Sequence, residues 1–187
     1  DVPDGLEAPL PTWDSAARWI GDDGVHESAG WGRHTLEGTA DRDVLEARTK
    51  GTKTLEGGDG DDIYLDFGQS QIVEQAGEGF DWVVKTDGGW GYRMPDHVEG
   101  LYLHNDIAFT NPVKGNAADN VFVGGTAGGN AFKGGVGDDV MYGGPKGGNR
   151  FEGGAGTDTY VMAGARADYT VEAGPDHGYT VTRPDGT

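Results

Sequence analysis

The chain contains no cysteine, so no disulfide framework holds its fold together. It has no apolar run approaching the roughly 18 to 20 residues of a membrane helix, so membrane insertion is not expected. Basic residues are also scarce, because 14 Lys and Arg stand against 32 Asp and Glu in 187 residues, a formal net charge of −18. This acidity argues against binding to nucleic acid or to an anionic membrane surface. Such a chain repels itself until cations bind, which predicts cation-dependent folding.

Glycine, in contrast, is abundant at 36 residues, and it recurs with a period over residues 115–161. Five successive repeats of nine or ten residues each begin with glycines, carry Asp or Asn at a sixth conserved place, and have an apolar residue two places later. A repeat this short cannot bury a core alone, so successive copies must stack. A disordered Gly/Asp-rich loop is the alternative, but disorder would not keep an apolar residue in register five times. The residues predicted to point inward are Phe122, Phe132, Met141, Phe151 and Tyr160.

Two consecutive repeats make one coil in this interpretation, so the turns alternate between two edges and repeats two apart stack directly. Asn120, Asp139 and Asp158 follow one another at intervals of 19 on one edge. Asn130 and Asn149 have the same interval on the other edge. Stacked carboxylates and turn carbonyls form oxygen cages that suit a hard cation such as Ca²⁺. We therefore expect firm calcium binding on the edge with Asp139 and Asp158, and weak or no binding beside the uncharged amides.

A shorter set of turns precedes this stretch, over residues 38–65. Asp43 and Asp62 repeat the interval of 19, which predicts a calcium site on one edge. The intervening turn has Lys53 where the acid would stand, and a cation there disfavours calcium, so that edge is predicted to be empty. Glycine makes these tight turns because it reaches positive φ without steric cost. The predicted calcium-site residues are Asp43, Asp62, Asp139, Asp158, Asp59, Asp61, Asp138, Asn120, Asn130, Asn149, Gly58, Gly60, Gly135, Gly137, Gly154 and Gly156.

Residues 67–114 break the nine-residue rhythm but remain strand-like in composition. Within them, Glu74, Glu78 and Asp81 come close together. One more calcium site and an ordinary polar turn are both open interpretations of this cluster.

Both ends of the chain differ from the repeats. The N-terminal stretch is rich in proline and contains Trp13, Trp19 and Trp31, which we expect to cover the open end of the stack, because terminal repeats need capping. Near the other end, residues 169–171 and 179–181 alternate around a Gly/Pro/Asp turn, which predicts a β-hairpin. The abrupt beginning and end predict that the chain is a piece of a longer protein.

The repeats GGDGDDIYL, GGVGDDVMY and GGAGTDTYV resemble the nonapeptide repeats of RTX proteins, which are exported by type I secretion. The stretch GEGFDWVV is similar to the element that joins two repeat blocks in that family, and the tail AGARADYTV is similar to the segment that often follows them. The resemblance implies an all-β, right-handed parallel β-roll, several bound Ca²⁺ ions, and folding after export to the extracellular space or cell surface. It carries the calcium acids over to Asp43, Asp62, Asp139 and Asp158.

The resemblance also implies an organisation in five parts that form one structural unit. They are an N-terminal linker or capping segment (1–36), a first repeat block (37–66), a connecting β segment (67–114), a second repeat block (115–161) and a C-terminal hairpin (162–187).

The connecting segment departs from the family where small polar residues usually point outward, because Phe80, Trp82, Arg93 and Tyr102 stand there instead. Flat rings on a rigid sheet suit the apolar faces of sugars, and basic side chains supply hydrogen bonds to hydroxyls or carboxylates. Packing of these aromatics under the N-terminal segment or against a neighbouring domain is the open alternative. The predicted saccharide-binding set is Trp82, Trp90, Tyr92, Arg93, His97, Tyr102, His104 and Lys85.

No nucleophile, base and orienting group assemble in the sequence, so we expect no catalysis. A proton-abstracting cluster of Tyr92, Arg93, His97 and His104 acting on a uronic acid is the weaker alternative. The favoured function is a monomeric, calcium-binding accessory module that attaches a covalently linked, carbohydrate-active catalytic domain to a polysaccharide, acidic or neutral. The competing function is a structural, secretory or adhesive scaffold with no ligand except calcium.

Overall fold

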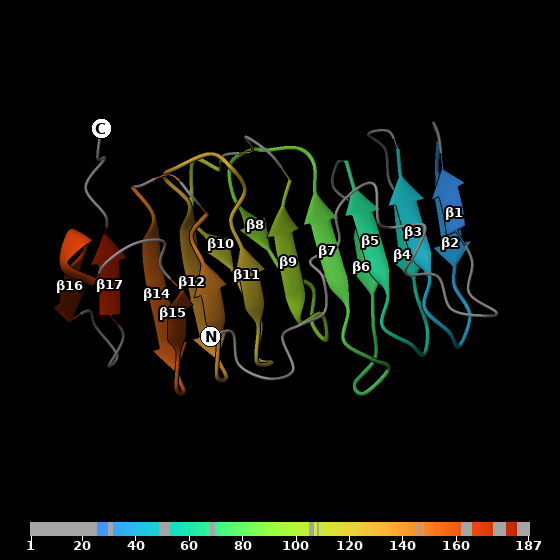
Figure 1. Ribbon diagram of the computed structural model, residues 1–187. Helices are drawn as coiled ribbons and strands as arrows, with labels where there is room; N and C mark the ends of the chain where they lie inside the picture. The colour runs from blue at the N-terminus through green and yellow to red at the C-terminus, as the bar shows by residue number, and fades with distance from the viewer. Residues whose placement is uncertain are drawn as a thin grey trace.

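The computed structural model describes residues 26–29, 32–48, 53–67, 70–104, 107, 109–144, 146, 148–161, 166–173 and 179–182. These residues form a parallel β-solenoid, as expected, in which the chain alternates between two facing layers of strands (Figure 1). Among the described residues, no helix is long and apolar enough to cross a membrane. The tryptophans expected to cap the stack, Trp13, Trp19 and Trp31, lie outside the described residues.

One layer of the solenoid is an eight-stranded sheet in which every neighbouring pair is parallel. Its strands follow one another in chain order, with the strands of the second layer between them. They are β1 (His26–Ala29), β3 (Val44–Ala47), β5 (Ile63–Asp66), β7 (Trp82–Lys85), β9 (Gly100–Leu103), β11 (Val121–Val123), β13 (Val140–Tyr142) and β15 (Thr159–Val161).

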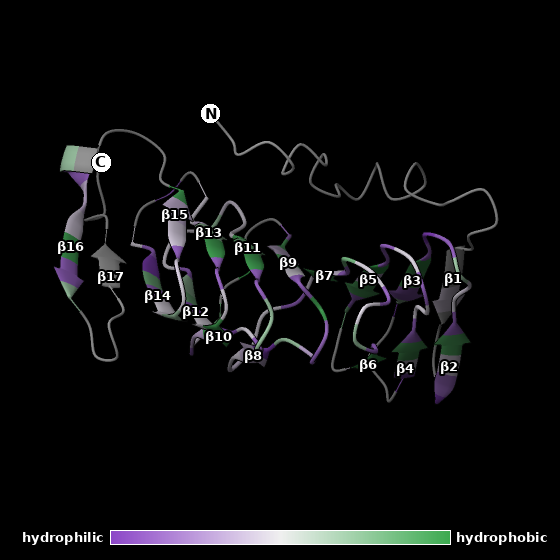
Figure 2. Ribbon diagram, turned by 90° about the horizontal axis from the view of Figure 1, so that it is seen from below, coloured by the Kyte–Doolittle hydropathy of each residue, from purple (hydrophilic) through white to green (hydrophobic). Residues whose placement is uncertain are grey.

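The second layer is divided into two sheets, which lie on the opposite side of the solenoid in Figure 2. The first sheet contains β2 (His34–Glu37), β4 (Lys53–Glu56) and β6 (Gln71–Val73). The second contains, in spatial order, β16 (Thr170–Ala173), β17 (Tyr179–Thr182), β14 (Arg150–Ala155), β12 (Ala131–Val136), β10 (Val113–Lys114) and β8 (Tyr92–Arg93). The interruption therefore falls between β6 and β8, within the connecting segment.

The registers confirm that repeats two apart stack directly. Phe132 pairs with Phe151 in β12 and β14. Met141 pairs with Tyr160 in β13 and β15. The eight-stranded sheet runs on through the connecting segment, because Trp82 of β7 pairs with both neighbouring strands. Strands β1 and β2 lie within the segment expected to be a cap, and they already form a coil of the solenoid.

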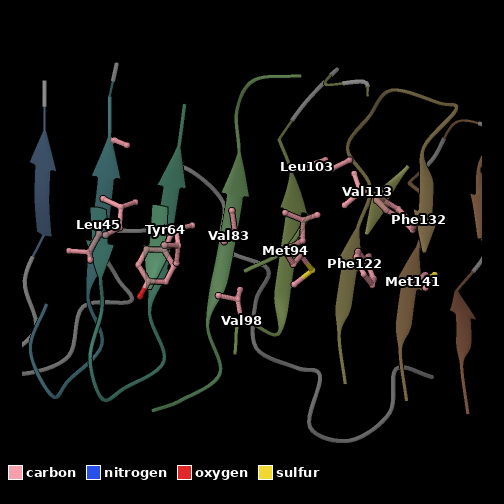
Figure 3. Packing of buried hydrophobic residues seen from close by; sticks show 14 of the residues in the cluster. Leu45, Tyr64, Val83, Met94, Val98, Leu103, Val113, Phe122, Phe132 and Met141 are labelled. Carbon is pink, nitrogen blue, oxygen red and sulfur yellow. The ribbon is translucent and has the colours of Figure 1, made fainter. Parts of the chain in front are cut away.

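The main core lies between the two layers (Figure 3). Each strand of the second repeat stretch contributes one inward side chain, as predicted. The aromatic members stack along the solenoid axis, with ring centroids 5.3 Å apart for Phe122 and Phe132 and 6.0 Å for Phe132 and Phe151. Tyr160 continues the stack at 5.5 Å from Phe151. The Phe122–Phe132 and Phe151–Tyr160 contacts join the two layers, and the Phe132–Phe151 contact joins neighbouring coils, so no single repeat has to bury a core by itself.

A second buried apolar cluster lies on the other face of the eight-stranded sheet, because successive side chains of a strand alternate between faces. Its members are Val44, Ile63, Leu65, Trp82, Val84, Val121 and Val123. The sheet is therefore buried on both faces over these strands, as is usual for parallel sheets.

The predicted C-terminal hairpin is confirmed. Strands β16 and β17 pair antiparallel, with Val171 opposite Val181. Strand β17 also pairs antiparallel with β14, so the hairpin ends the parallel ladder of the second layer. A short 3₁₀ turn, Arg166–Asp168, precedes it.

Candidate metal centre

A ladder of acids lies along the edge where the chain enters the eight-stranded sheet; we call it the acidic edge. The backbone N–H of Asp43 donates to Asp62 Oδ1 at 2.8 Å, and the N–H of Asp62 donates to Asp81 Oδ1 at 2.8 Å. The N–H of Asp81 then donates to Glu99 Oε2 at 3.0 Å. One oxygen of each acid thus holds the backbone of the preceding coil.

The ladder continues in the second repeat stretch. The N–H of Asn120 donates to Asp139 Oδ1 at 2.8 Å, and the N–H of Asp139 donates to Asp158 Oδ1 at 3.1 Å. The acidic edge is thus defined by Asp43, Asp62, Asp81, Glu99, Asn120, Asp139 and Asp158.

Glycine is required beside these acids because the carboxylate lies directly on the turn backbone. A Cβ at Gly57 would overlap Asp62 Oδ2, and a Cβ at Gly134 would overlap Asp139 Oδ2. The turn glycines also lie against carbonyls of the preceding coil, as Gly58 does against the Thr39 carbonyl. All six glycines of the predicted calcium set have positive φ: Gly58, Gly60, Gly135, Gly137, Gly154 and Gly156.

The second oxygens of several ladder acids have no hydrogen-bond donor. Asp62 Oδ2, Asp81 Oδ2 and Asp139 Oδ2 are buried without a partner. Burial raises the pKa of Asp62 and of Asp139 to about 7, although backbone hydrogen bonds act against this increase. Buried polar atoms are normally paired, and an unpaired carboxylate is costly. The residues therefore fit a cation that would supply the missing interaction.

The other predicted acids are in different environments. Asp43 accepts hydrogen bonds from the Thr39 N–H and, at 3.3 Å, from the Thr39 hydroxyl, whereas Asp158 is only half-buried. Asp61 accepts the N–H of Phe80 at 3.0 Å. Two more predicted acids, Asp59 and Asp138, are exposed, and Asp138 accepts the N–H of Thr157 at 2.6 Å.

On the opposite edge, side-chain donors occupy the equivalent turns. Asn149 Oδ1 accepts the N–H of Asn130 at 3.0 Å, and Asn149 Nδ2 donates to the Lys146 carbonyl at 2.8 Å. Asn130 Nδ2 donates to the Ala127 carbonyl at 2.9 Å. Lys53 has the corresponding place at the start of β4 and is fully buried. These turns carry their own donors, so their carbonyls need no metal.

Asn120 behaves like the amides of the opposite edge, although it belongs to the acidic edge. Its Oδ1 accepts the N–H of Asn116 at 3.0 Å, and its Nδ2 donates to the Val98 carbonyl at 3.1 Å. The side-chain amide of Asn120 therefore supplies hydrogen bonds to the backbone at this position of the ladder.

The densest group of acids in the described part of the chain is Asp62, Glu74 and Asp81. Each contributes one carboxylate oxygen to a set that lies within 4.8 Å of one another, and all three residues are buried. Burial raises the pKa of Glu74 to about 9 and that of Asp81 to about 8, and charge repulsion within the cluster adds to both shifts. Such a group could hold a metal ion. The sequence placed Glu74 near Asp81, but it did not show that Asp62 joins them.

The predicted saccharide-binding face is wrong in its central members. Trp82 is only 6% exposed, because it packs against Phe80 and its ring covers Gly100. Lys85 is 3% exposed and forms ion pairs with Asp66 at 2.7 Å and with Asp87 at 2.8 Å.

The remaining members of that set do not form one surface. Tyr92 and Arg93 belong to β8 in the second layer, and the Tyr92 ring packs against the main core. Tyr102 belongs to β9 in the eight-stranded sheet, half-buried, with its ring centroid 6.2 Å from that of His104. The exposed members are Trp90 at 80%, Arg93 and His97.

No protein-family model matches the chain, and no solved structure matches it. Over 94 residues the chain is 36% identical to the Endo-1,3-1,4-beta-glycanase ExsH of Rhizobium meliloti (strain 1021). The match covers 49% of this chain and 19% of that protein, so the chain corresponds to a minor part of the relative's length.

Proposed function

We propose that the chain is a non-catalytic, calcium-binding RTX-type module of a secreted, carbohydrate-active protein, and that it folds when Ca²⁺ fills the turns of the acidic edge. The observation that carries this proposal is the pair of buried, unpartnered oxygens of Asp62 and Asp139 in a solenoid of stacked glycine turns. Calcium takes six to eight oxygen ligands from carboxylates, carbonyls and water. The acidic edge offers oxygen ligands of these kinds.

Bound calcium would neutralise the carboxylates and draw neighbouring coils together. Without it, the chain must fold against a net charge of −18 with several acids buried. Extracellular modules typically bind calcium with dissociation constants of about 10⁻⁴ to 10⁻³ M. Such a module stays unfilled in the cytosol and folds outside the cell. The similarity to part of a glycanase supports a place in a carbohydrate-active parent protein.

Calcium titration of the folding transition tests this proposal. We expect far-UV circular dichroism to show a cooperative gain of β-structure as Ca²⁺ rises through the millimolar range. Asp139→Asn, which keeps the Oδ1 acceptor but removes the charge, should lower the number of bound ions. The matched control Glu172→Gln alters an exposed acid on β16, outside the acidic edge. A wild-type chain that binds no calcium by isothermal titration calorimetry would refute the proposal.

Polysaccharide binding is a second candidate, and the exposed ring of Trp90 favours it. This ring is 80% exposed beside β8, which also presents the exposed Arg93. An exposed indole offers a flat apolar face to a sugar ring, and a guanidinium binds hydroxyls or carboxylates. The purely structural scaffold is the competing function.

Affinity electrophoresis through gels that contain neutral or acidic polysaccharides separates the two candidates. Retardation by one polysaccharide in calcium, weakened in Trp90→Ala, would support binding through this ring. Equal migration of both proteins on every gel, with calcium-induced folding intact, would leave the structural scaffold.

A further inference from the structure

The turn between β6 and β7 is built differently from the turn that precedes it in the stack. The earlier turn, Gly57–Asp62, links β4 to β5, whereas Glu74–Asp81 links β6 to β7 and is two residues longer. The added length is offset before β6, because β4 and β6 pair at an interval of 17 residues (Thr54 with Gln71) whereas β5 and β7 keep the interval of 19 (Ile63 with Trp82). The first residue after the strand is therefore Glu74, where the preceding coil has Gly57.

Glu74 therefore adds a carboxylate to the acidic edge at a position where the preceding coil has glycine. Both oxygens of Glu74 are buried without a hydrogen-bond partner, and the residue is only 7% exposed. Asp62 Oδ2 and Asp81 Oδ2 are unpartnered in the same way. Four oxygens thus lie buried without donors, whereas Oδ1 of Asp62 and Oδ1 of Asp81 each accept a backbone N–H.

At another buried acid, Asp66, the chain supplies the positive charge from its own side chain. Asp66 is 1% exposed, and it is paired with Lys85 at 2.7 Å and accepts the Ser70 hydroxyl at 3.0 Å. The Asp62, Glu74 and Asp81 cluster is instead flanked by a further acid, Glu78, whose charge raises the pKa of both Asp62 and Glu74. The missing positive charge must therefore come from outside the chain.

A groove lined by other acids lies next to the cluster. It has a volume of about 240 Å³, and its lining includes the acids Glu37, Glu56 and Glu78. Gly57 also lines the groove, and its Cα lies against the Asp62 carboxylate. A cleft with acids along it concentrates cations from solution.

We propose that Asp62, Glu74 and Asp81 form a dedicated Ca²⁺ site that differs from the repeat turns and binds calcium more tightly than they do. Three carboxylates at one point give a greater ligand charge than two stacked acids, and ligand charge sets calcium affinity. The free Glu74 carboxylate is suited to bidentate binding, which favours Ca²⁺ over the smaller Mg²⁺. With only oxygen ligands, the site is unlike those of zinc. The inference rests on the proposed function only for the identity of the ion.

The test compares Glu74→Gln with wild type in calcium and in chelator. In calcium, calorimetric titration should show the tightest site weakened about tenfold or more, because one carboxylate ligand is lost. In chelator at neutral pH, the melting temperature should be higher for Glu74→Gln than for wild type, because the buried amide requires neither a charge nor a bound proton in the folded state. This reversal of sign separates metal binding from a packing role. The matched control is Glu172→Gln on β16, an exposed residue, which should change neither quantity.

Unchanged calcium affinity and stoichiometry in Glu74→Gln would overturn the inference. Should Glu74→Gln fail to fold in any condition, Asp81→Asn replaces it, since the amide keeps the Oδ1 acceptor of the ladder, and the same outcomes apply. Asp139→Asn distinguishes the two proposals. If Asp139→Asn binds fewer ions and Glu74→Gln binds as wild type does, only this inference fails. If wild type binds no calcium, the proposed function fails with it.

Discussion

The two edges of the solenoid differ in how the polar groups of their stacked turns are paired. On the acidic edge, Asp62 and Asp139 each leave one buried oxygen without a donor. On the opposite edge, Asn130 and Asn149 donate their own amide hydrogens to turn carbonyls. The glycine turns and the interval of 19 residues are common to both edges.

The difference indicates that a stacked turn needs a donor or a positive charge. On the opposite edge the chain carries the donor, and on the acidic edge we propose that a cation from solution supplies the charge. Lys85 is an internal cation that stays with Asp66 at any calcium concentration. On the acidic edge, Asp62, Asp81 and Asp139 have no hydrogen-bond partner for their second oxygens. We therefore expect stability on the acidic edge to depend on cations in solution, whereas the opposite edge carries its own donors.

Removal of calcium should have the largest effect on the molecule. At pH 8, excess chelator should lower the melting temperature more than any substitution does, because the buried carboxylates of Asp62 and Asp139 are then ionised and uncompensated. The measurement is circular dichroism melting with calcium and with chelator. A transition that chelator leaves unchanged would show that the acidic edge needs no cation.

Acidification should partly replace calcium. The pKa values of Asp62 and Asp139 are raised from 3.8 to about 7, that of Asp81 to about 8, and that of Glu74 from 4.5 to about 9. Because the folded chain binds more protons than the unfolded one, these groups stabilise it fully below about pH 4. That stability is lost as pH rises through 7 to 9. Calcium-free protein should therefore melt at a higher temperature at pH 5 than at pH 8, whereas the gain from added calcium should be greater at pH 8.

Loss of the internal cation should be the next largest effect. Lys85→Met leaves the buried Asp66 carboxylate without its partner and should lower the free energy of unfolding by about 3–5 kcal/mol. Urea denaturation in saturating calcium measures this change. The double variant with Asp66→Asn should recover part of the loss. Added calcium should not restore the free energy of unfolding of Lys85→Met. A restoration by calcium would show that both edges respond to the cation.

Conversion of the opposite edge into an acidic one should have a moderate effect. Asn149→Asp places a carboxylate against the Lys146 carbonyl and removes a donor, so the free energy of unfolding in chelator should fall by about 1–3 kcal/mol. Calcium should recover part of this loss. Asn149→Ala removes the donor without adding charge and should show no such recovery. Equal calcium responses in Asn149→Asp and Asn149→Ala would contradict the proposed difference between the two edges.

The smallest effect on stability should come from Trp90→Ala. The side chain is 80% exposed, and exposed substitutions usually change the free energy of unfolding by less than about 0.5 kcal/mol. Urea denaturation in calcium checks this. A larger loss would mean that Trp90 supports the fold and would weaken the case for a binding role.

The sequence by itself determined the solenoid and its register. The inward places of Phe132 and Met141, the interval of 19 residues and the C-terminal hairpin all follow from local rules, because glycine turns and strand alternation repeat with a fixed period. The acids that stack, such as Asp139 on Asn120, are fixed by the same period.

Only the tertiary structure decided which side chains are buried and which acids meet. Alternation placed Trp82 on the outer face of its strand, but the packing of that face made it a core residue rather than a binding platform. The period also could not place Glu74, because β6 follows β4 at an interval of 17 residues instead of 19 and the turn after β6 is two residues longer. The group of Asp62, Glu74 and Asp81 therefore depends on contacts between coils, which no single repeat contains.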